Sequence, residues 1–286
     1  MTDTISYIHS TLKDIYPPEE IRSFIRLIME HVCGIQSYQL LSDKDKELSD
    51  SEKGEIKEII ERLRQSEPIQ YIIGKTCFYG YEFLVNQSTL IPRPETEELV
   101  ERILIDQKEG KINLLDIGTG SGCIAITLAK KIKGSQVTAI DISKEALTTA
   151  KKNADILGVD NITFIQADIL SNEQLDIISH NSYDLIVSNP PYVMISEKEG
   201  MEKNVLLHEP ENALFVPDND PLLFYRRIAQ LGNKYLKPNG FLYFEINAQL
   251  GQEMITLLQN ENYENVKLLK DLSGKDRISI AQLQKK

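Results

Sequence analysis

The chain reads Leu114-Leu115-Asp116-Ile117-Gly118-Thr119-Gly120-Ser121-Gly122 where an apolar run meets three glycines at alternate positions. The apolar run predicts a buried strand, and the glycines let the chain turn tightly while a ligand approaches the backbone closely. The spacing Gly-x-Gly-x-Gly differs from the Gly-x-Gly-x-x-Gly of dinucleotide-binding turns. Asp116 can order this turn and hold the ammonium group of a methionine moiety through water. The stretch therefore predicts a turn that binds S-adenosylmethionine.

Apolar runs and helix-like stretches alternate through the chain beyond residue 111. This alternation is typical of a mostly parallel sheet with helices on both faces. The tail, 266–272 and 277–283 around Ser273-Gly274, predicts a final hairpin. We therefore expect an α/β, Rossmann-like fold with a C-terminal antiparallel hairpin. The expected strands are 112–117, 136–140, 162–166, 183–188 and 240–246, and the clearest helices are 124–131 and 144–157.

The first 75 residues have a different pattern, because their apolar side chains recur at helical spacing. Residues 76–95 are instead rich in aromatic and β-branched side chains, which favours a β-hairpin. We expect a helical domain over 1–75, a hairpin linker over 76–95 and the cofactor-binding domain over 96–286. The helical domain is a candidate for contact with a protein, and the alternative is a cap that only stabilises the fold. Its two apolar stripes are Ile21, Phe24, Ile25, Ile28 and Ile56, Ile59, Ile60, Leu63.

Composition limits the function classes. No apolar run reaches the roughly 18 residues of a membrane span, and the N-terminus lacks the pattern of a signal peptide. The isolated cysteines Cys33, Cys77 and Cys123 fit a reducing cytoplasm and argue against disulfides and a zinc site. The net charge of −11 counts against a grip on duplex nucleic acid without excluding it. We expect a cytoplasmic protein without a bound metal or a membrane contact.

Two further expected strands end in acidic residues that suit the same cofactor. Asp141 follows the strand 136–140, where its carboxylate can accept hydrogen bonds from both hydroxyls of a ribose. Asp168 follows the strand 162–166, where it can meet the exocyclic amine of an adenine. Ile169 can pack on the adenine ring.

The expected strand 183–188 ends at Asn189-Pro190-Pro191-Tyr192. Ligands in such sheets bind at the carboxyl ends of the strands, so this tetrapeptide is predicted to project toward the methyl group of the cofactor. An Asn-Pro pair is also a common turn signal. The functional interpretation is favoured here because the same chain carries the glycine turn.

The residue types of this loop match the chemistry of a planar nitrogen. An amide or aniline-like nitrogen is a poor nucleophile, because its lone pair is delocalised, and it carries two N–H groups. The Asn189 side-chain oxygen and the Pro190 carbonyl can each accept one of them, while Pro191 stiffens the loop. Tyr192 can stack on the planar group. Positioning would then be the main catalytic effect, and no strong general base is required.

Asn-Pro-Pro-Tyr loops are similar in DNA adenine, RNA guanine and protein glutamine methyltransferases, so this loop alone leaves the substrate open. Over nearly its whole length, however, the chain resembles the release-factor glutamine methyltransferase family. The most specific stretch is Pro92-Arg93-Pro94-Glu95-Thr96-Glu97, followed by the glycine turn. The other matching stretches are 70–74, 78–80, 115–122, 189–192, 209–214 and 236–240.

The resemblance implies a class I methyltransferase domain that methylates N5 of the glutamine in the Gly-Gly-Gln loop of peptide chain release factors. It implies that S-adenosylmethionine is converted to S-adenosylhomocysteine, and that the helical domain over 1–75 helps to hold the factor. By position, Asn189, Pro190, Pro191 and Tyr192 would contact the glutamine. The residues that would contact the cofactor are Gly118, Thr119, Gly120, Ser121, Gly122, Asp141, Ile169 and Asn189.

The resemblance also places Arg93 and Glu97 at the border of the pocket. Residues 215–221 and Ile169 depart from the family pattern, which bears on the substrate cleft and on adenine packing. The main alternative is a nucleic-acid amino-methyltransferase acting on adenine N6 or guanine N2, although no large target-recognition region or basic cleft is visible. A third reading is a cofactor-binding module without activity. We expect a monomer that acts on release factors and makes no direct contact with nucleic acid.

Overall fold

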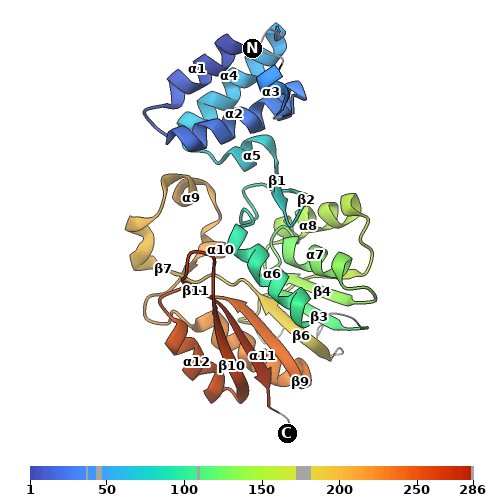
Figure 1. The fold of residues 1–286 in the computed structure, drawn as a ribbon. Coiled ribbons are helices and arrows are strands. Elements are labelled where there is room, and N and C mark those ends of the chain that lie inside the picture. The colour runs from blue at the N-terminus through green and yellow to red at the C-terminus, as the bar shows by residue number, and fades with distance from the viewer. Residues whose placement is uncertain (37, 43–46, 108–109, 172–181, 285–286) are drawn as a thin grey trace. The chain divides into compact units, whose positions relative to one another are not determined.

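The computed structural model describes all residues of the chain except 37, 43–46, 108–109, 172–181 and 285–286 (Figure 1). The described chain divides into two compact units. We call Met1–Gly74 with Glu202–His208 the helical unit, and Lys75–Met201 with Glu209–Lys286 the sheet unit. Among the described residues, no helix is both long enough and apolar enough to cross a bilayer.

The helical unit is built on the two stripes that the sequence predicts. Both stripes are buried, on α2 and α4, and they pack with Ile8 and Leu12 of α1 in one core. Helix α4 begins in a capping box, in which the Ser49 side chain accepts from the Glu52 backbone N–H. The helices of this unit are α1 (Thr2–Leu12), α2 (Pro18–Cys33), α3 (Gln39–Ser42), α4 (Asp50–Arg64) and α5 (Ile69–Ile73).

One element of the helical unit comes from far along the chain. Helix α9 (Lys203–His208) groups with the first 74 residues rather than with its neighbours in sequence. The His208 ring nitrogen lies 3.1 Å from the backbone oxygen of Gln65, just beyond α4. The sequence does not predict this contact, because no local pattern marks a six-residue helix as part of another unit.

The sheet unit contains a seven-stranded sheet in the order β10-β11-β9-β6-β3-β4-β5. Its five strands from β9 to β5 run parallel, and β11 and β10 add the antiparallel C-terminal pair, as predicted. The strands are β3 (Asn113–Ile117), β4 (Gln136–Asp141), β5 (Ile162–Gln166), β6 (Tyr183–Ser188), β9 (Leu236–Glu245), β10 (Tyr263–Lys270) and β11 (Asp276–Leu283).

Strand β9 begins earlier than expected. The sequence predicts a start at residue 240, after Pro238 and Asn239, but the strand begins at Leu236. Its pairing with β6 shifts register between Tyr183 and Leu185, and Asn239 has a φ of 65°. The turn-forming residues are therefore absorbed as an irregularity inside the strand, as in a β-bulge.

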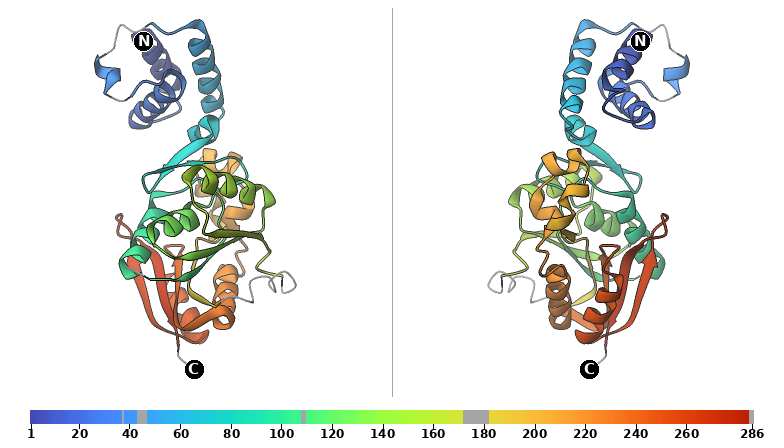
Figure 2. Two further views of the ribbon diagram at one scale, coloured as in Figure 1. Left: turned by 90° about the vertical axis from the view of Figure 1, so that its right-hand side faces the viewer. Right: turned by 90° about the vertical axis from the view of Figure 1, so that its left-hand side faces the viewer.

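Helices cover both faces of the sheet (Figures 1 and 2). Helices α11 and α12 pack on one face, together with alternate strand residues such as Leu115 and Ile186. Helices α6, α7 and α8 pack on the other face, where Leu114 and Leu185 point. This alternation places both faces in hydrophobic cores. The helices are α6 (Pro94–Asp106), α7 (Cys123–Lys131), α8 (Lys144–Leu157), α11 (Leu223–Tyr235) and α12 (Gly251–Asn260).

The predicted hairpin is formed by β1 (Lys75–Phe78) and β2 (Tyr81–Leu84). Its rings Phe78 and Phe83 are buried in the same core as α6 and α7. The Asn153 side chain on α8 accepts from the Leu84 N–H at 2.7 Å and donates to the Leu84 carbonyl at 3.0 Å. The hairpin is thus an integral part of the sheet unit's packing.

Short elements connect β6 to α11. They are β7 (Val193–Met194), the 3-10 helix η2 (Ile195–Gly200), α9, α10 (Glu211–Leu214) and β8 (Phe215–Val216). Strands β7 and β8 pair in parallel. This connection matters for the site, because its α10–β8 part forms one wall of the main cavity.

Candidate active site

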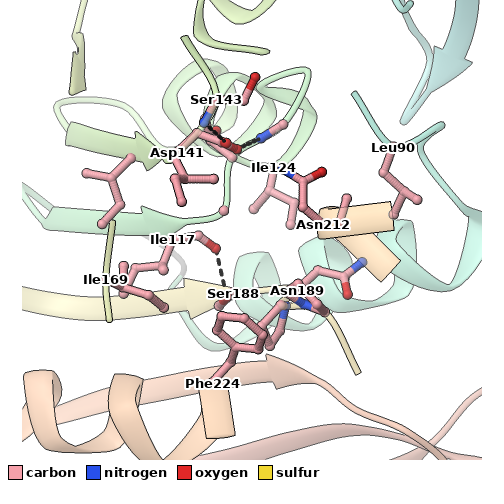
Figure 3. A pocket seen from close by; sticks show the side chains of 18 of the residues that line it. Leu90, Ile117, Ile124, Asp141, Ser143, Ile169, Ser188, Asn189, Asn212 and Phe224 are labelled. Carbon is pink, nitrogen blue, oxygen red and sulfur yellow. Dashed lines mark hydrogen bonds between the residues drawn. The ribbon is translucent and has the colours of Figure 1, made fainter. Parts of the chain in front are cut away.

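A cavity of about 400 Å³ opens at the carboxyl ends of β3, β4, β5 and β6, within the sheet unit (Figure 3). This is where ligands bind in open α/β sheets. Its walls come from four strand ends, from the start of α6 and from α10, β8 and α11. The lining residues at the strand ends are 117–121, 140–143, 167–170 and 188–191, and the others are Ser88, Leu90, Pro92, Arg93, Thr96, Cys123, Ile124, Asn212, Ala213, Phe215 and Phe224.

The glycine turn, residues 118–122, has the backbone that the sequence predicts. Gly118, Gly120 and Gly122 have φ values of 75°, 55° and 82°, a region that side chains disfavour. A Cβ at Gly122 would lie 2.8 Å from Ile126 Cδ1 and 3.1 Å from Ala150 Cβ. Gly122 therefore allows α7 and α8 to pack closely, and it does not itself line the cavity, whereas residues 118–121 do.

Asp116 lies beneath the glycine turn and is fully buried. Its Oδ2 accepts from the Thr119 hydroxyl at 2.7 Å, while its Oδ1 has no hydrogen-bond partner among the described residues. Burial raises the pKa of Asp116 to about 7, with Asp141 adding to the rise, against the Thr119 hydroxyl and the Ala125 N–H, which lower it. Asp116 does not itself line the cavity, but a buried carboxylate oxygen without a partner fits a cationic group.

The acids at the ends of β4 and β5 also face the cavity. Asp141 accepts from the backbone N–H groups of Gly120 at 2.8 Å and Ser143 at 2.9 Å, so its carboxylate bridges two loops (Figure 3). Burial raises the pKa of Asp141. Asp168 and Ile169 both line the cavity. The structure therefore brings the predicted ribose and adenine residues to one wall.

The acceptor loop, residues 189–192, begins beside the glycine turn. Ile117 and Ser188 are paired in the sheet, and the Ser188 hydroxyl donates to the Ile117 carbonyl at 2.7 Å. Asn189, Pro190 and Pro191 line the cavity. The structure thus joins the two predicted halves of the site.

Tyr192 lies elsewhere than predicted. It does not line the cavity but packs against the hydrophobic core beside α11 and α12. Its hydroxyl donates to Glu245 Oε1 at 3.1 Å, and burial raises its pKa. The aromatic ring beside Asn189 in the cavity is that of Phe224 from α11 (Figure 3). Sequence reasoning missed Phe224, because a lone aromatic residue near the start of a helix carries no motif.

Arg93 and Glu97, both expected at the border of the pocket, lie in different places. Arg93 lines the cavity and forms an ion pair with the buried carboxylate of Glu209. Glu209 also accepts from the Ile91 N–H at 3.3 Å, which ties the start of α6 to the segment before α10. Glu97 does not line the cavity but accepts from the Tyr79 N–H at 2.7 Å. It therefore fastens the hairpin to α6.

The arrangement of the sheet, the glycine turn and the acceptor loop defines a class I S-adenosylmethionine-dependent methyltransferase. Residues 108–279 match the family described as a methyltransferase domain, and residues 3–74 match the PrmC N-terminal domain. A methyltransferase from Pyrococcus furiosus has a similar fold, with a TM-score of 0.56 at 16% identity. The similarity covers 78% of this chain and 99% of that one.

More closely similar sequences identify the family. The release factor glutamine methyltransferase of Bacteroides thetaiotaomicron is 50% identical, over 98% of this chain and 99% of its own. That of Flavobacterium psychrophilum is 47% identical, over 93% of each chain. The chain belongs to the release factor glutamine methyltransferase family.

Proposed function

We propose that this protein transfers the methyl group of S-adenosylmethionine to the side-chain amide nitrogen, N5, of a glutamine in a peptide chain release factor. The observation that supports this most directly is the position of Asn189 and Pro190 in the cavity wall next to the glycine turn. Two fixed hydrogen-bond acceptors beside the glycine turn suit an NH2 group, because such a group has two hydrogens to donate. Bound S-adenosylmethionine supplies an electrophilic methyl carbon on a positively charged sulfur.

The residues of the glycine turn and the neighbouring strand ends hold the cofactor. Gly118, Thr119, Gly120 and Ser121 border it with their backbone, and the Asp141 carboxylate accepts from the ribose hydroxyls. Asp168 and Ile169 bind the adenine, and Asp116 holds the ammonium group through water. The orphaned Oδ1 of Asp116 fits a positively charged group, and the glycines of the turn let a ligand approach the backbone closely.

The acceptor loop orients the nucleophile. Asn189 Oδ1 and the Pro190 carbonyl each accept one N–H of the glutamine amide, and the prolines keep the loop stiff. The two hydrogen bonds favour a more tetrahedral nitrogen with its lone pair aimed at the methyl carbon. Catalysis is then mostly positioning, with acceptors aimed at the positive charge that develops on nitrogen.

The proton leaves without a dedicated base. A methylated amide nitrogen is cationic and loses its proton readily. As far as the chain is described, no histidine or lysine lines the cavity. Phe224 takes the place beside the planar amide that was expected for Tyr192.

The partner of this protein is a peptide chain release factor. The target glutamine lies in a Gly-Gly-Gln loop, Arg93 contacts the factor near the cavity, and the helical unit helps to hold the factor. The protein acts as a monomer in the cytoplasm and makes no direct contact with nucleic acid. The net charge of −11 supports this last point.

A labelling experiment tests the proposal. The protein is incubated with methyl-labelled S-adenosylmethionine and either a release factor, the same factor with its Gly-Gly-Gln glutamine changed to alanine, or duplex DNA. We expect label on the unaltered factor alone, at one site that mass spectrometry assigns to the glutamine side chain. Label on DNA, or equal label on the altered factor, would contradict it.

A further inference from the structure

A hydrogen-bonded chain runs from the acceptor loop into the core of the sheet unit. Asn189 Nδ2 lies 3.3 Å from the hydroxyl oxygen of Thr96 at the start of α6. That hydroxyl lies 2.6 Å from Oε2 of Glu245, and Tyr192 Oη lies 3.1 Å from Oε1 of the same carboxyl group. Glu245 ends β9 and is 1% exposed, and Thr96 is 3% exposed. The contact between Thr96 and Glu245 is therefore shielded from water.

The number of protons determines the direction of these bonds. A carboxylate only accepts, so an ionised Glu245 receives the protons of Thr96 and Tyr192. Thr96 has a single hydroxyl proton and gives it to Glu245. Its oxygen can then only accept from Asn189, and an amide presents a donor only through its NH2 group. The Asn189 NH2 group is thus held against Thr96.

Three neighbouring groups favour the carboxylate form of Glu245. Two hydroxyl groups bond to it, and the Arg277 guanidinium lies close enough to lower its pKa. Burial is the largest influence on this carboxyl group and, together with Glu95, raises the pKa of Glu245. The other titratable groups that face it are Tyr225, whose hydroxyl donates to the Glu245 backbone oxygen, and the buried Cys123 thiol.

We infer that Thr96 and Glu245 are positioning residues that hold the Asn189 carboxamide with its oxygen toward the cavity. This inference rests on the proposed function, in which that oxygen accepts an N–H of the glutamine. An asparagine amide has nearly the same shape in both orientations, so its own packing does not select one. With the amide reversed, an NH2 group would face the NH2 group of the substrate, and two donors would meet.

The loss of the Thr96 hydroxyl would favour that reversed orientation. In Thr96→Val the side chain keeps its shape, but the Asn189 NH2 group would face a methyl group without an acceptor. Turning the NH2 group into the cavity restores its hydrogen bonds to water. A buried unsatisfied donor costs about as much as a tenfold change in an equilibrium, so we expect kcat to fall about tenfold in this variant.

The test compares Thr96→Val with Thr96→Ser, which keeps the hydroxyl. Steady-state methylation of a release factor at saturating concentrations gives kcat, and calorimetry gives the dissociation constant of S-adenosylmethionine. We expect Thr96→Val to lose about tenfold in kcat while Thr96→Ser stays within about twofold, both with unchanged cofactor affinity. Thr96→Ala, which also lacks the hydroxyl, replaces Thr96→Val if that variant does not fold. Equal kcat for variants with and without the hydroxyl would overturn the inference.

A second background separates orientation from general packing. In Asn189→Asp both side-chain oxygens accept, so there is no amide left to misorient. Addition of Thr96→Val to Asn189→Asp should then cost less than about twofold in kcat, whereas a merely structural role would cost the same tenfold again. Failure of the proposed function would be seen separately, as absence of label on the release factor with the unaltered protein.

Discussion

The glycine turn and the acceptor loop start from adjacent, paired residues of β3 and β6, yet they depend on different parts of the chain. The conformation of the turn depends on its backbone, because its three glycines have positive φ values. Residues 118–121 of the turn line the cavity. The acceptor loop depends on side chains far away in sequence. Asn189 is 93 residues from its partner Thr96, and Tyr192 is 53 residues from Glu245.

The difference shows that one active site can combine a part that depends on backbone conformation with a part whose side chains are oriented by distant residues. The glycines allow the positive φ values of the turn, and the Ile140 carbonyl and the Asp141 carboxylate accept from its backbone N–H groups. The loop also needs α6 and β9 to orient its amide. Substitutions in the glycine turn and in the acceptor loop should therefore affect different properties of the protein.

The largest expected effect comes from the acceptor loop. Asn189→Ala removes the side-chain acceptor for the amide nitrogen, and loss of one such group typically costs about 10²- to 10³-fold in kcat. S-adenosylmethionine should still bind, because the turn and Asp141 are untouched. Steady-state labelling and calorimetry measure the two quantities. The expected difference between the acceptor loop and the glycine turn would be contradicted by an unchanged kcat. It would also be contradicted if the variant lost only affinity for S-adenosylmethionine.

A substitution in the glycine turn should instead lower the free energy of unfolding, through backbone strain and steric overlap. Gly122→Ala places a methyl group 2.8 Å from Ile126 Cδ1 at a φ of 82°, so strain and overlap add to about 3 kcal/mol of lost unfolding free energy. Gly158→Ala is the matched control, since its φ is 65° and a Cβ there has nothing within 4 Å. It should lose only about 1 kcal/mol, from strain alone. Urea unfolding compares them, and equal losses would show that close packing at Gly122 is unimportant.

The same contrast explains how much the sequence could predict. The parallel sheet, the C-terminal hairpin, and the placement of Asp141, Asp168 and the acceptor loop at one cavity all follow from strand patterns and from residues at strand ends. Such residues are recognisable because a parallel sheet gathers the carboxyl ends of its strands at one edge.

What could not be predicted depends on side-chain direction and on distant contacts. Tyr192 belongs to the motif, yet it points to Glu245 because that buried carboxylate requires donors. Glu97 turns to the hairpin for a similar reason, since the Tyr79 N–H needs an acceptor. Phe224 enters the cavity from α11, more than thirty residues beyond the loop, and only the folded chain brings the two together.

Beneath the glycine turn, Asp116 should make cofactor binding depend on pH. Burial raises its pKa to about 7, and a bound ammonium group should lower it. Binding then releases a proton, so the affinity for S-adenosylmethionine should rise with pH up to about 7, by at most about tenfold per unit, and level off above it. Asp116→Asn should flatten this dependence, measured by calorimetry at several pH values. A dependence that persists in the variant would assign it to another group.

Asp116 should also affect stability, with the opposite sign. Its pKa in the folded state lies above the usual value of about 3.9, so the folded protein binds more protons than the unfolded chain between about pH 4 and 7. The unfolding free energy of the ligand-free protein should therefore fall as the pH rises through this range. The slope should be smaller in Asp116→Asn, and urea unfolding at pH 5 and pH 8 measures it.

The smallest expected effect concerns the rings of Tyr192 and Phe224, which should influence different kinetic constants. Tyr192→Phe keeps the ring but removes the hydroxyl that donates to Glu245, a loss of about 1 kcal/mol that should lower kcat several-fold without changing KM for the release factor. Phe224→Leu alters the ring that lines the cavity and should mainly raise that KM. The reverse pattern would mean that Tyr192 turns into the cavity when the substrate binds. In that case all four residues of the acceptor loop would contact the substrate. The hydrogen bond from Tyr192 to Glu245 would then exist only in the ligand-free protein.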